Sequence, residues 1–105
     1  MSDVPESHPR RDSLLARRKL ADAGARGLLA DSAMIAHGRG EAYDYLLEER
    51  TTASAARAIL EVASRLLSAN RSVISVNGNT IVLAGKQLIR VAAVVGCPIE
   101  VNLYH

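Results

Sequence analysis

Apolar residues recur at helical spacing through the first part of the chain. Across residues 10–26 they fall near one face, and Gly27 is placed to end that helix. The apolar segment 28–36 fits either a helical turn or an extended connector. A further helix is expected over residues 40–48. The residues expected to face inward from it are Ala42, Tyr45 and Leu46.

The clearest helical pattern follows a run of hydroxyl side chains. Residues 51–54 read Thr-Thr-Ala-Ser, which supplies side-chain oxygens suited to a helix N-cap. In residues 55–70 the apolar positions form one continuous stripe of an amphipathic helix. That stripe comprises Ala55, Ile59, Val62, Ala63, Leu66 and Leu67.

Beyond Asn70 the pattern changes from helical to strand-like. Residues 72–76 (SVISV) are short and β-branched, as in a buried strand. Residues 86–95 have helical period and end before Gly96, and residues 98–104 alternate like a second strand. Between them, residues 80–84 fit either a strand or a helical turn. The order strand, helix, strand predicts a parallel βαβ unit, while an Asn-Gly hairpin after the first strand is an equally weighted alternative.

These elements indicate an α/β fold, with N-terminal helices packed on the first βαβ unit of a Rossmann-like parallel sheet. We expect one domain, with a helical part over about residues 8–70 and the βαβ unit over about residues 72–104. Two strands make a small sheet, so we expect the chain to be the N-terminal portion of a longer protein or to depend on a partner.

Composition narrows the possible functions. The net charge of +2 over 105 residues does not call for a nucleic-acid partner. The single cysteine, Cys97, excludes an intrachain disulfide, and neither His8 nor His37 has neighbours at metal-ligand spacing, so no metal site is expected. Because there is no long uninterrupted apolar run and no secretory signal, we expect a cytoplasmic protein without a membrane partner.

The segment Gly38-Arg39-Gly40, preceded by His37, carries the first candidate chemistry. At a helix start, glycines and unpaired backbone N–H groups would suit a phosphate, and Arg39 could grip two of its oxygens. By itself, however, such a segment is more often a turn whose arginine is solvated. Arg17 would strengthen the anion hypothesis if its helix packed beside this turn.

A second candidate is Asn77-Gly78-Asn79, which directly follows the first predicted strand. In open parallel sheets, ligands bind at the carboxyl ends of the strands. The amide side chains can donate and accept hydrogen bonds, and Gly78 permits close approach. An ordinary turn explains the same residues. Five basic residues precede this region, and a solvated helix face is their simpler interpretation: Arg10, Arg11, Arg17, Arg18 and Lys19.

Several of these segments, in this order, resemble a known family. They are Ser7-His8-Pro9-Arg10, the run 35–46 (IAHGRGEAYDYL), Glu49-Arg50-Thr51, the run 73–79 (VISVNGN) and the run 99–104 (IEVNLY). Together they are similar to the archaeal 4-phosphopantoate–β-alanine ligases, also called archaeal phosphopantothenate synthetases. The resemblance extends over nearly the whole chain.

That resemblance implies an ATP-dependent ligase that condenses 4-phosphopantoate with β-alanine, through an acyl-adenylate, on the route to coenzyme A. ATP would serve as co-substrate with Mg²⁺. Carried over by position, Arg17 and Arg39 would bind ATP phosphates, and His37, Asn77, Gly78 and Asn79 would be candidates for substrate binding. The family also implies a homodimer, for which the helix over residues 52–69 is the expected contact. Two alternatives remain open: a non-catalytic nucleotide- or anion-binding module, and a helical interaction domain.

Overall fold

The structure is a computed structural model that describes residues 4–102. These residues form two compact units, 4–50 and 51–102, each of which is described by itself. The first unit contains helices α1 (Arg11–Ala25) and α2 (Ser32–Leu46). The second contains helix α3 (Ala53–Ser68), strand β1 (Ile74–Val76), helix α4 (Gly78–Val95) and strand β2 (Ile99–Val101). This combination confirms a partial α/β fold. The division at Thr51 groups α3 with the strands, and the single domain expected from the sequence stays a prediction.

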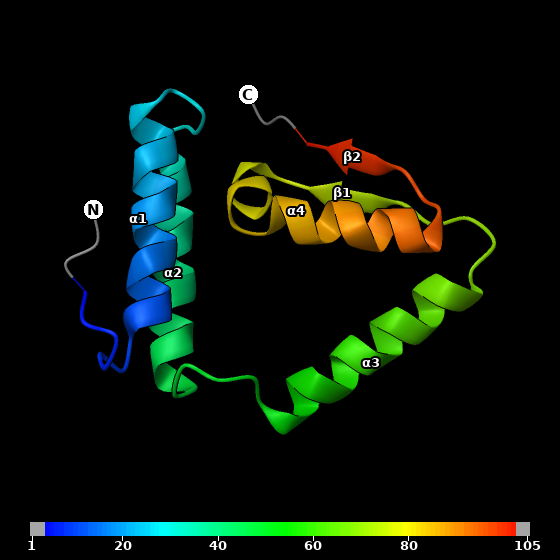
Figure 1. The fold of residues 1–105 in the computed structure, drawn as a ribbon, viewed down its shortest axis with the longest axis horizontal. Coiled ribbons are helices and arrows are strands. Elements are labelled where there is room, and N and C mark those ends of the chain that lie inside the picture. The colour runs from blue at the N-terminus through cyan, green and yellow to red at the C-terminus, as the bar shows by residue number, and fades with distance from the viewer. Residues whose placement is uncertain (1–3, 103–105) are drawn as a thin grey trace. The chain divides into compact units, whose positions relative to one another are not determined.

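Helices α1 and α2 lie side by side and run in opposite directions (Figure 1). Leu20 is fully buried and Ala23 is nearly so, and both belong to α1. Gly27 ends this helix in the left-handed region at φ 75°, which favours glycine, and the Leu28 amide then donates to the Ala23 carbonyl at 2.9 Å. The predicted first helix and its glycine terminator are therefore confirmed.

Helix α2 differs from the prediction in an important way. It begins at Ser32 and continues without a break to Leu46. The segment 28–36, for which a helical turn and an extended connector were both open, and the helix expected over residues 40–48 therefore belong largely to one element. Gly38-Arg39-Gly40 lies in its middle, where backbone N–H groups are used by the helix itself. The hypothesis of an anion-binding helix start at this segment is wrong.

The inward face predicted for the C-terminal half of α2 is also wrong. Ala42, Tyr45 and Leu46 are all exposed. Glu41 instead points toward α1, because its carboxylate accepts a hydrogen bond from Arg17. These three residues thus line open surface, although Tyr45, one helical turn after Glu41, still lies beside Arg10.

In the second unit, β1 and β2 form the predicted parallel pair, with Ile74 opposite Ile99 and Val76 opposite Val101. The Asn102 amide donates to the Val76 carbonyl at 2.8 Å, which extends this ladder at the end of β2. Helix α4 connects the strands and packs against both. The parallel pairing rules out the hairpin alternative. Leu103 and Tyr104, the last residues of the predicted second strand, lie outside the described residues.

Helix α4 is longer than the sequence suggested. It starts at Gly78 rather than near Lys86, so Gly78 and Asn79 are its first residues and not part of a loop. The Asn77 side chain caps it by accepting hydrogen bonds from the Thr80 amide at 3.0 Å and the Thr80 hydroxyl at 2.8 Å. Gly96, at φ 76°, ends it as predicted.

In the described part of the chain, α4 is long enough and apolar enough to cross a membrane when only its length and mean hydropathy are considered. Lys86 and Arg90 lie in its middle, where a bilayer would make each charge costly. Its packing against β1 and β2 is that of a crossover helix in a parallel unit.

The mid-helix position of Gly40 makes a testable prediction. A methyl group there would meet no atom within 4 Å, so Gly40→Ala is expected to stabilise the protein by about 0.5–1 kcal/mol through the lower flexibility of the unfolded chain. Gly27→Ala serves as the opposite control, because its left-handed backbone should make alanine destabilising. Chemical denaturation measures both changes. A destabilised Gly40→Ala protein would contradict a continuous α2.

Candidate functional site

The two helices of the first unit are joined by an ion pair. Arg17 on α1 donates from Nη1 to Glu41 Oε1 on α2. The Glu41 side chain is only 14% exposed, whereas that of Arg17 is 47% exposed. The arginine therefore keeps open surface for a ligand while its partner carboxylate is held in the interface.

His37 belongs to the same cluster. It lies one helical turn before Glu41, with its Nε2 atom 4.0 Å from Glu41 Oε1, and its side chain is 15% exposed. Among residues 4–102, this buried nitrogen has no hydrogen-bond partner. The structure thus brings together two of the predicted site residues, Arg17 and His37, and adds Glu41 between them.

Arg39 lies elsewhere on the first unit. It precedes Glu41 by two residues on the same helix, which turns it about 200° away from the stripe that faces α1. Its side chain is exposed. The side-by-side arginine pair suggested by the sequence is therefore not formed within this unit. The ATP-binding roles of Arg17 and Arg39 stay predictions.

A second ion pair ties the end of α2 to the start of α1. Arg10 Nε donates to Glu49 Oε1 at 2.7 Å, and the Ser13 hydroxyl donates to Glu49 Oε2. The Arg10 guanidinium also lies 5.6 Å from the centre of the Tyr45 ring, within cation–π range. The basic residues 10–19 are thus more than a solvated face, because Arg10 forms an ion pair with Glu49 and Arg17 forms one with Glu41.

The backbone after α2 is strained where it delivers Glu49. Glu48 and Glu49 have φ values of 65° and 58°, in the left-handed region that costs a residue other than glycine about 1 kcal/mol or more. The Glu49 amide compensates in part by donating to the Asp44 carbonyl at 2.8 Å. This turn reverses the chain and points the Glu49 carboxylate back toward Arg10 and Ser13.

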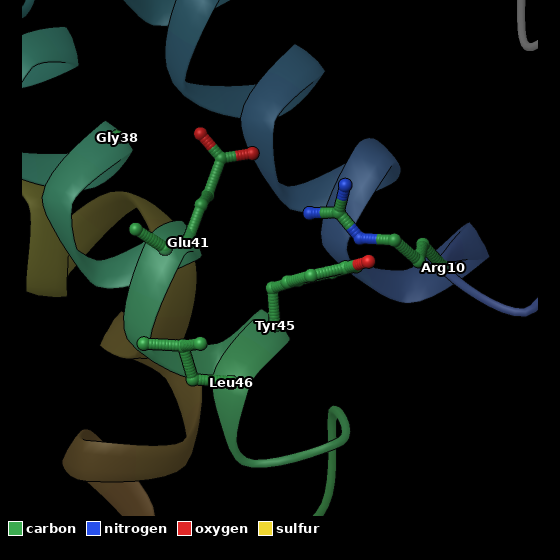
Figure 2. A pocket seen from close by; sticks show the side chains of 6 residues that line it. Arg10, Gly38, Glu41, Tyr45 and Leu46 are labelled. Atoms are coloured by element: carbon green, nitrogen blue, oxygen red, sulfur yellow. The ribbon is translucent and has the colours of Figure 1, made fainter.

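An open groove of about 600 Å³ runs along this surface. Figure 2 shows Arg10 on one side, Glu41 on the other and Tyr45 beside them. The remaining lining residues are Gly38, Ala42 and Leu46. A Cβ at Gly38 would meet no atom within 4 Å. Glycine is therefore not required there for helix packing, and it leaves the groove wall low.

In the second unit, Asn77, Gly78 and Asn79 lie at the carboxyl end of β1, where a parallel sheet presents ligands to a helix N-terminus. The Asn77 side-chain oxygen is used by Thr80, so its first role is structural. Substrate binding by these three residues stays a prediction. A cavity of about 290 Å³ in this unit is lined by apolar residues of β1, α4 and β2 with no ionisable side chain.

Residues 4–102 hold no group of three His, Cys, Asp or Glu side chains that could bind a metal ion. A Mg²⁺ ion bound to nucleotide does not depend on such a group, because it takes much of its coordination from phosphate oxygens and water.

Sequence reasoning missed three residues of this site: Arg10, Glu41 and Glu49. In the sequence, Glu41 cannot be told apart from an ordinary carboxylate on the surface of a helix. Only the hydrogen bond from Arg17 shows that it belongs to the site. Arg10 and Glu49 are 39 positions apart, so no local sequence pattern predicts that they pair. Both residues lie inside the segments that carried the family resemblance, and this resemblance was the one signal that could have pointed to them.

Comparison with known proteins first identifies the class. Residues 54–105 match the sequence profile of the phosphopantothenate/pantothenate synthetase family. The chain also aligns over nearly its whole length with individual proteins from several organisms, which are named below. The resemblance inferred from the motifs is confirmed: over nearly its whole length the chain is similar in sequence to proteins of this family.

The relatives are named 4-phosphopantoate–β-alanine ligases. The protein from Methanospirillum hungatei is 52% identical over 97% of this chain, and that from Methanosarcina mazei is 47% identical over 100%. The protein from Thermococcus kodakarensis is 43% identical over 100% of this chain. The chain spans 42%, 42% and 40% of the lengths of these three relatives.

The Glu49 cluster predicts a pH dependence. The Ser13 hydroxyl and then Arg10 stabilise the ionised carboxylate and hold the pKa of Glu49 below its ordinary value. The stability that this carboxylate contributes is therefore complete above the unfolded pKa of about 4.3 and is lost as the pH falls through the lower folded pKa. Between pH 6 and pH 3, we expect the thermal midpoint of the unmodified protein to fall more than that of Glu49→Gln.

Glu48→Gln is the matched control for that measurement. The Glu48 carboxylate pairs with Arg50 at 2.5 Å, but both side chains are largely exposed, so its loss should matter little. If Glu49→Gln followed the same pH curve as Glu48→Gln, the Arg10–Glu49–Ser13 cluster would have no stabilising role in solution.

Proposed function

We propose that this chain forms part of an ATP-dependent ligase that joins 4-phosphopantoate to β-alanine and yields 4'-phosphopantothenate. The observation that carries the proposal is the 43–52% identity, over nearly all of this chain, to proteins named for that reaction. The proposed setting is the cytoplasm, where coenzyme A precursors and ATP meet.

The chemistry explains what such a site requires. A carboxylate does not react with an amine in water without activation. Attack of the 4-phosphopantoate carboxylate on the α-phosphorus of ATP would release pyrophosphate and form an acyl-adenylate, from which the β-alanine amine would displace AMP. ATP, with its Mg²⁺, and a phosphorylated acid bring several negative charges close together, and fixed arginines and backbone N–H groups are the donors that stabilise them. Arg17, Arg39 and the N-terminus of α4 offer these donors in the two units.

The structure favours a ligand-binding role over a purely helical interaction domain. In the latter, the arginines would be solvated separately, whereas Arg17 is held by the interfacial Glu41 beside His37. Such a preorganised, half-exposed cation suits an anionic ligand. A nucleotide-binding module without turnover shares this geometry, and product formation separates the two.

ATP binding tests the nucleotide part of this proposal. Arg39→Ala and Arg17→Ala are each expected to weaken ATP binding by about 1.5–3 kcal/mol, the range for charge-assisted hydrogen bonds. Isothermal titration calorimetry measures the change, with Arg57→Ala on the exposed face of α3 as the control. Mass spectrometry of the reaction with 4-phosphopantoate and β-alanine then tests for product. Equal ATP affinity in all three variants would remove both arginines from the nucleotide site.

The proposal includes a homodimer formed through α3. Thr52 caps this helix by accepting from the Ala55 amide at 3.2 Å, and its apolar stripe is the predicted one. The stripe is uncovered, since Leu67 is 70% exposed and Ile59 61%. In a soluble protein a continuous apolar stripe marks a contact surface. A second copy presents the same stripe, which two-fold symmetry would pair with the first.

A charge on the stripe should break this dimer. Leu67→Glu is expected to convert the dimer to monomer in analytical ultracentrifugation, because pairing would bury an uncompensated carboxylate. Ser64→Glu places the same charge on the polar side of α3, next to the Glu61–Arg65 pair, and should leave the assembly unchanged. A monomeric unmodified protein, or a dimer in both variants, would refute the α3 interface.

A further inference from the structure

We propose that the groove lined by Arg10 and Glu41 is the binding site for β-alanine, held as a zwitterion. Arg10 would take its carboxylate and Glu41 its ammonium group. The inference rests on the proposed function for the identity of the amino acid. The opposite charges of the groove are a separate observation about the first unit alone.

The atoms left available on Arg10 match a carboxylate. Its Nε atom donates to Glu49, while the two terminal nitrogens take part in no hydrogen bond with the residues that the structure describes. These two nitrogens form the edge of the guanidinium that grips both oxygens of a carboxylate. The Tyr45 ring and Glu49 fix the plane of the guanidinium, so the fork is oriented before a ligand arrives.

The atoms left available on Glu41 match an ammonium group. Arg17 donates to Oε1, and His37 Nε2 lies 4.0 Å from the same oxygen. The second oxygen, Oε2, accepts no hydrogen bond from residues 4–102. Figure 2 shows the guanidinium of Arg10 pointing across the groove toward the side from which the Glu41 carboxylate extends. An ammonium group bound at Oε2 would complete the coordination of this carboxylate.

The charge balance favours a zwitterion over a phosphate in this groove. Two cations, Arg10 and Arg17, face two carboxylates, Glu49 and Glu41, so the cluster is neutral when His37 is neutral. A phosphate dianion would add uncompensated negative charge beside both carboxylates. β-Alanine adds one charge of each sign and leaves the cluster neutral, while its two methylene groups fit the apolar lining of Ala42 and Leu46.

The first experiment compares ligands on the unmodified chain. Chemical-shift titration of the ¹⁵N-labelled protein is carried out with β-alanine, with propionate, which lacks the ammonium group, and with propylamine, which lacks the carboxylate. Loss of either charged end should weaken binding roughly tenfold or more, and the shifted amides should include those of Glu41 and Ala42. Propionate or inorganic phosphate binding as tightly as β-alanine would overturn the proposal in favour of a plain anion site.

The second experiment removes the charge of Glu41 and keeps its shape. Glu41→Gln retains a carbonyl oxygen for Arg17 but should weaken β-alanine roughly tenfold, while propionate binds equally well or better. Glu48→Gln, on the exposed pair with Arg50, is the matched control and should bind β-alanine normally. Unchanged β-alanine affinity in Glu41→Gln would remove Glu41 from the site, and circular dichroism checks that each variant is folded.

ATP titration of the same samples separates this inference from the proposed function. If ATP binds and depends on Arg39 while β-alanine binds no better than its two analogues, the amino-acid site is wrong and the nucleotide proposal stands. If neither ATP nor β-alanine binds, both proposals fail. Discrimination between β-alanine and its analogues that is lost in Glu41→Gln supports the site assigned here.

Discussion

The first unit depends on two ion pairs, in which arginines at the start of the chain bind the carboxylates of Glu41 in α2 and Glu49 in the turn after it. In residues 4–50 only Leu20 and Ala23 are buried apolar residues, so the apolar core is small. The ion pairs from Arg17 and Arg10 to Glu41 and Glu49 join α1 and its N-cap residue to α2 and the turn that follows it. Both carboxylates are mostly shielded from water, where such pairs lose less to screening than on an open surface. The same pairs shape the groove, because they fix the side chains that line it.

This arrangement links stability to ligand chemistry. Each charged pair uses one part of its arginine or glutamate and leaves another part available, as for the terminal nitrogens of Arg10 and the second oxygen of Glu41. The interactions that join the helices therefore also orient the groups proposed to bind substrate. The cost is visible in the turn after α2, where Glu48 and Glu49 adopt left-handed backbone so that the second carboxylate reaches α1.

The second unit shows that a local sequence pattern can predict the wrong turn when the pairing of the neighbouring strands is not known. Asn77-Gly78 resembles a hairpin turn, yet the Asn77 side chain caps α4 and the following residues are helical. Asparagine suits both positions because its short amide can bond to nearby backbone. The choice depends on whether the next strand pairs antiparallel or parallel, and the pairing of β1 with β2, more than twenty residues later, decides it.

From the sequence alone, the strongest periodic and capping signals were sufficient: α1, α3 with its Thr52 cap, the two strands, Gly27 and Gly96 could all be predicted. The family resemblance was also available from contiguous motifs. The continuous course of α2 through Gly38 and Gly40 required the tertiary structure, because packing on α1 outweighs the low helix propensity of two glycines. So did the partners of Glu41 and Glu49, which stand 24 and 39 positions from their arginines. Side-chain pairs across such separations carry no local period, and only the packing of the helices brings them together.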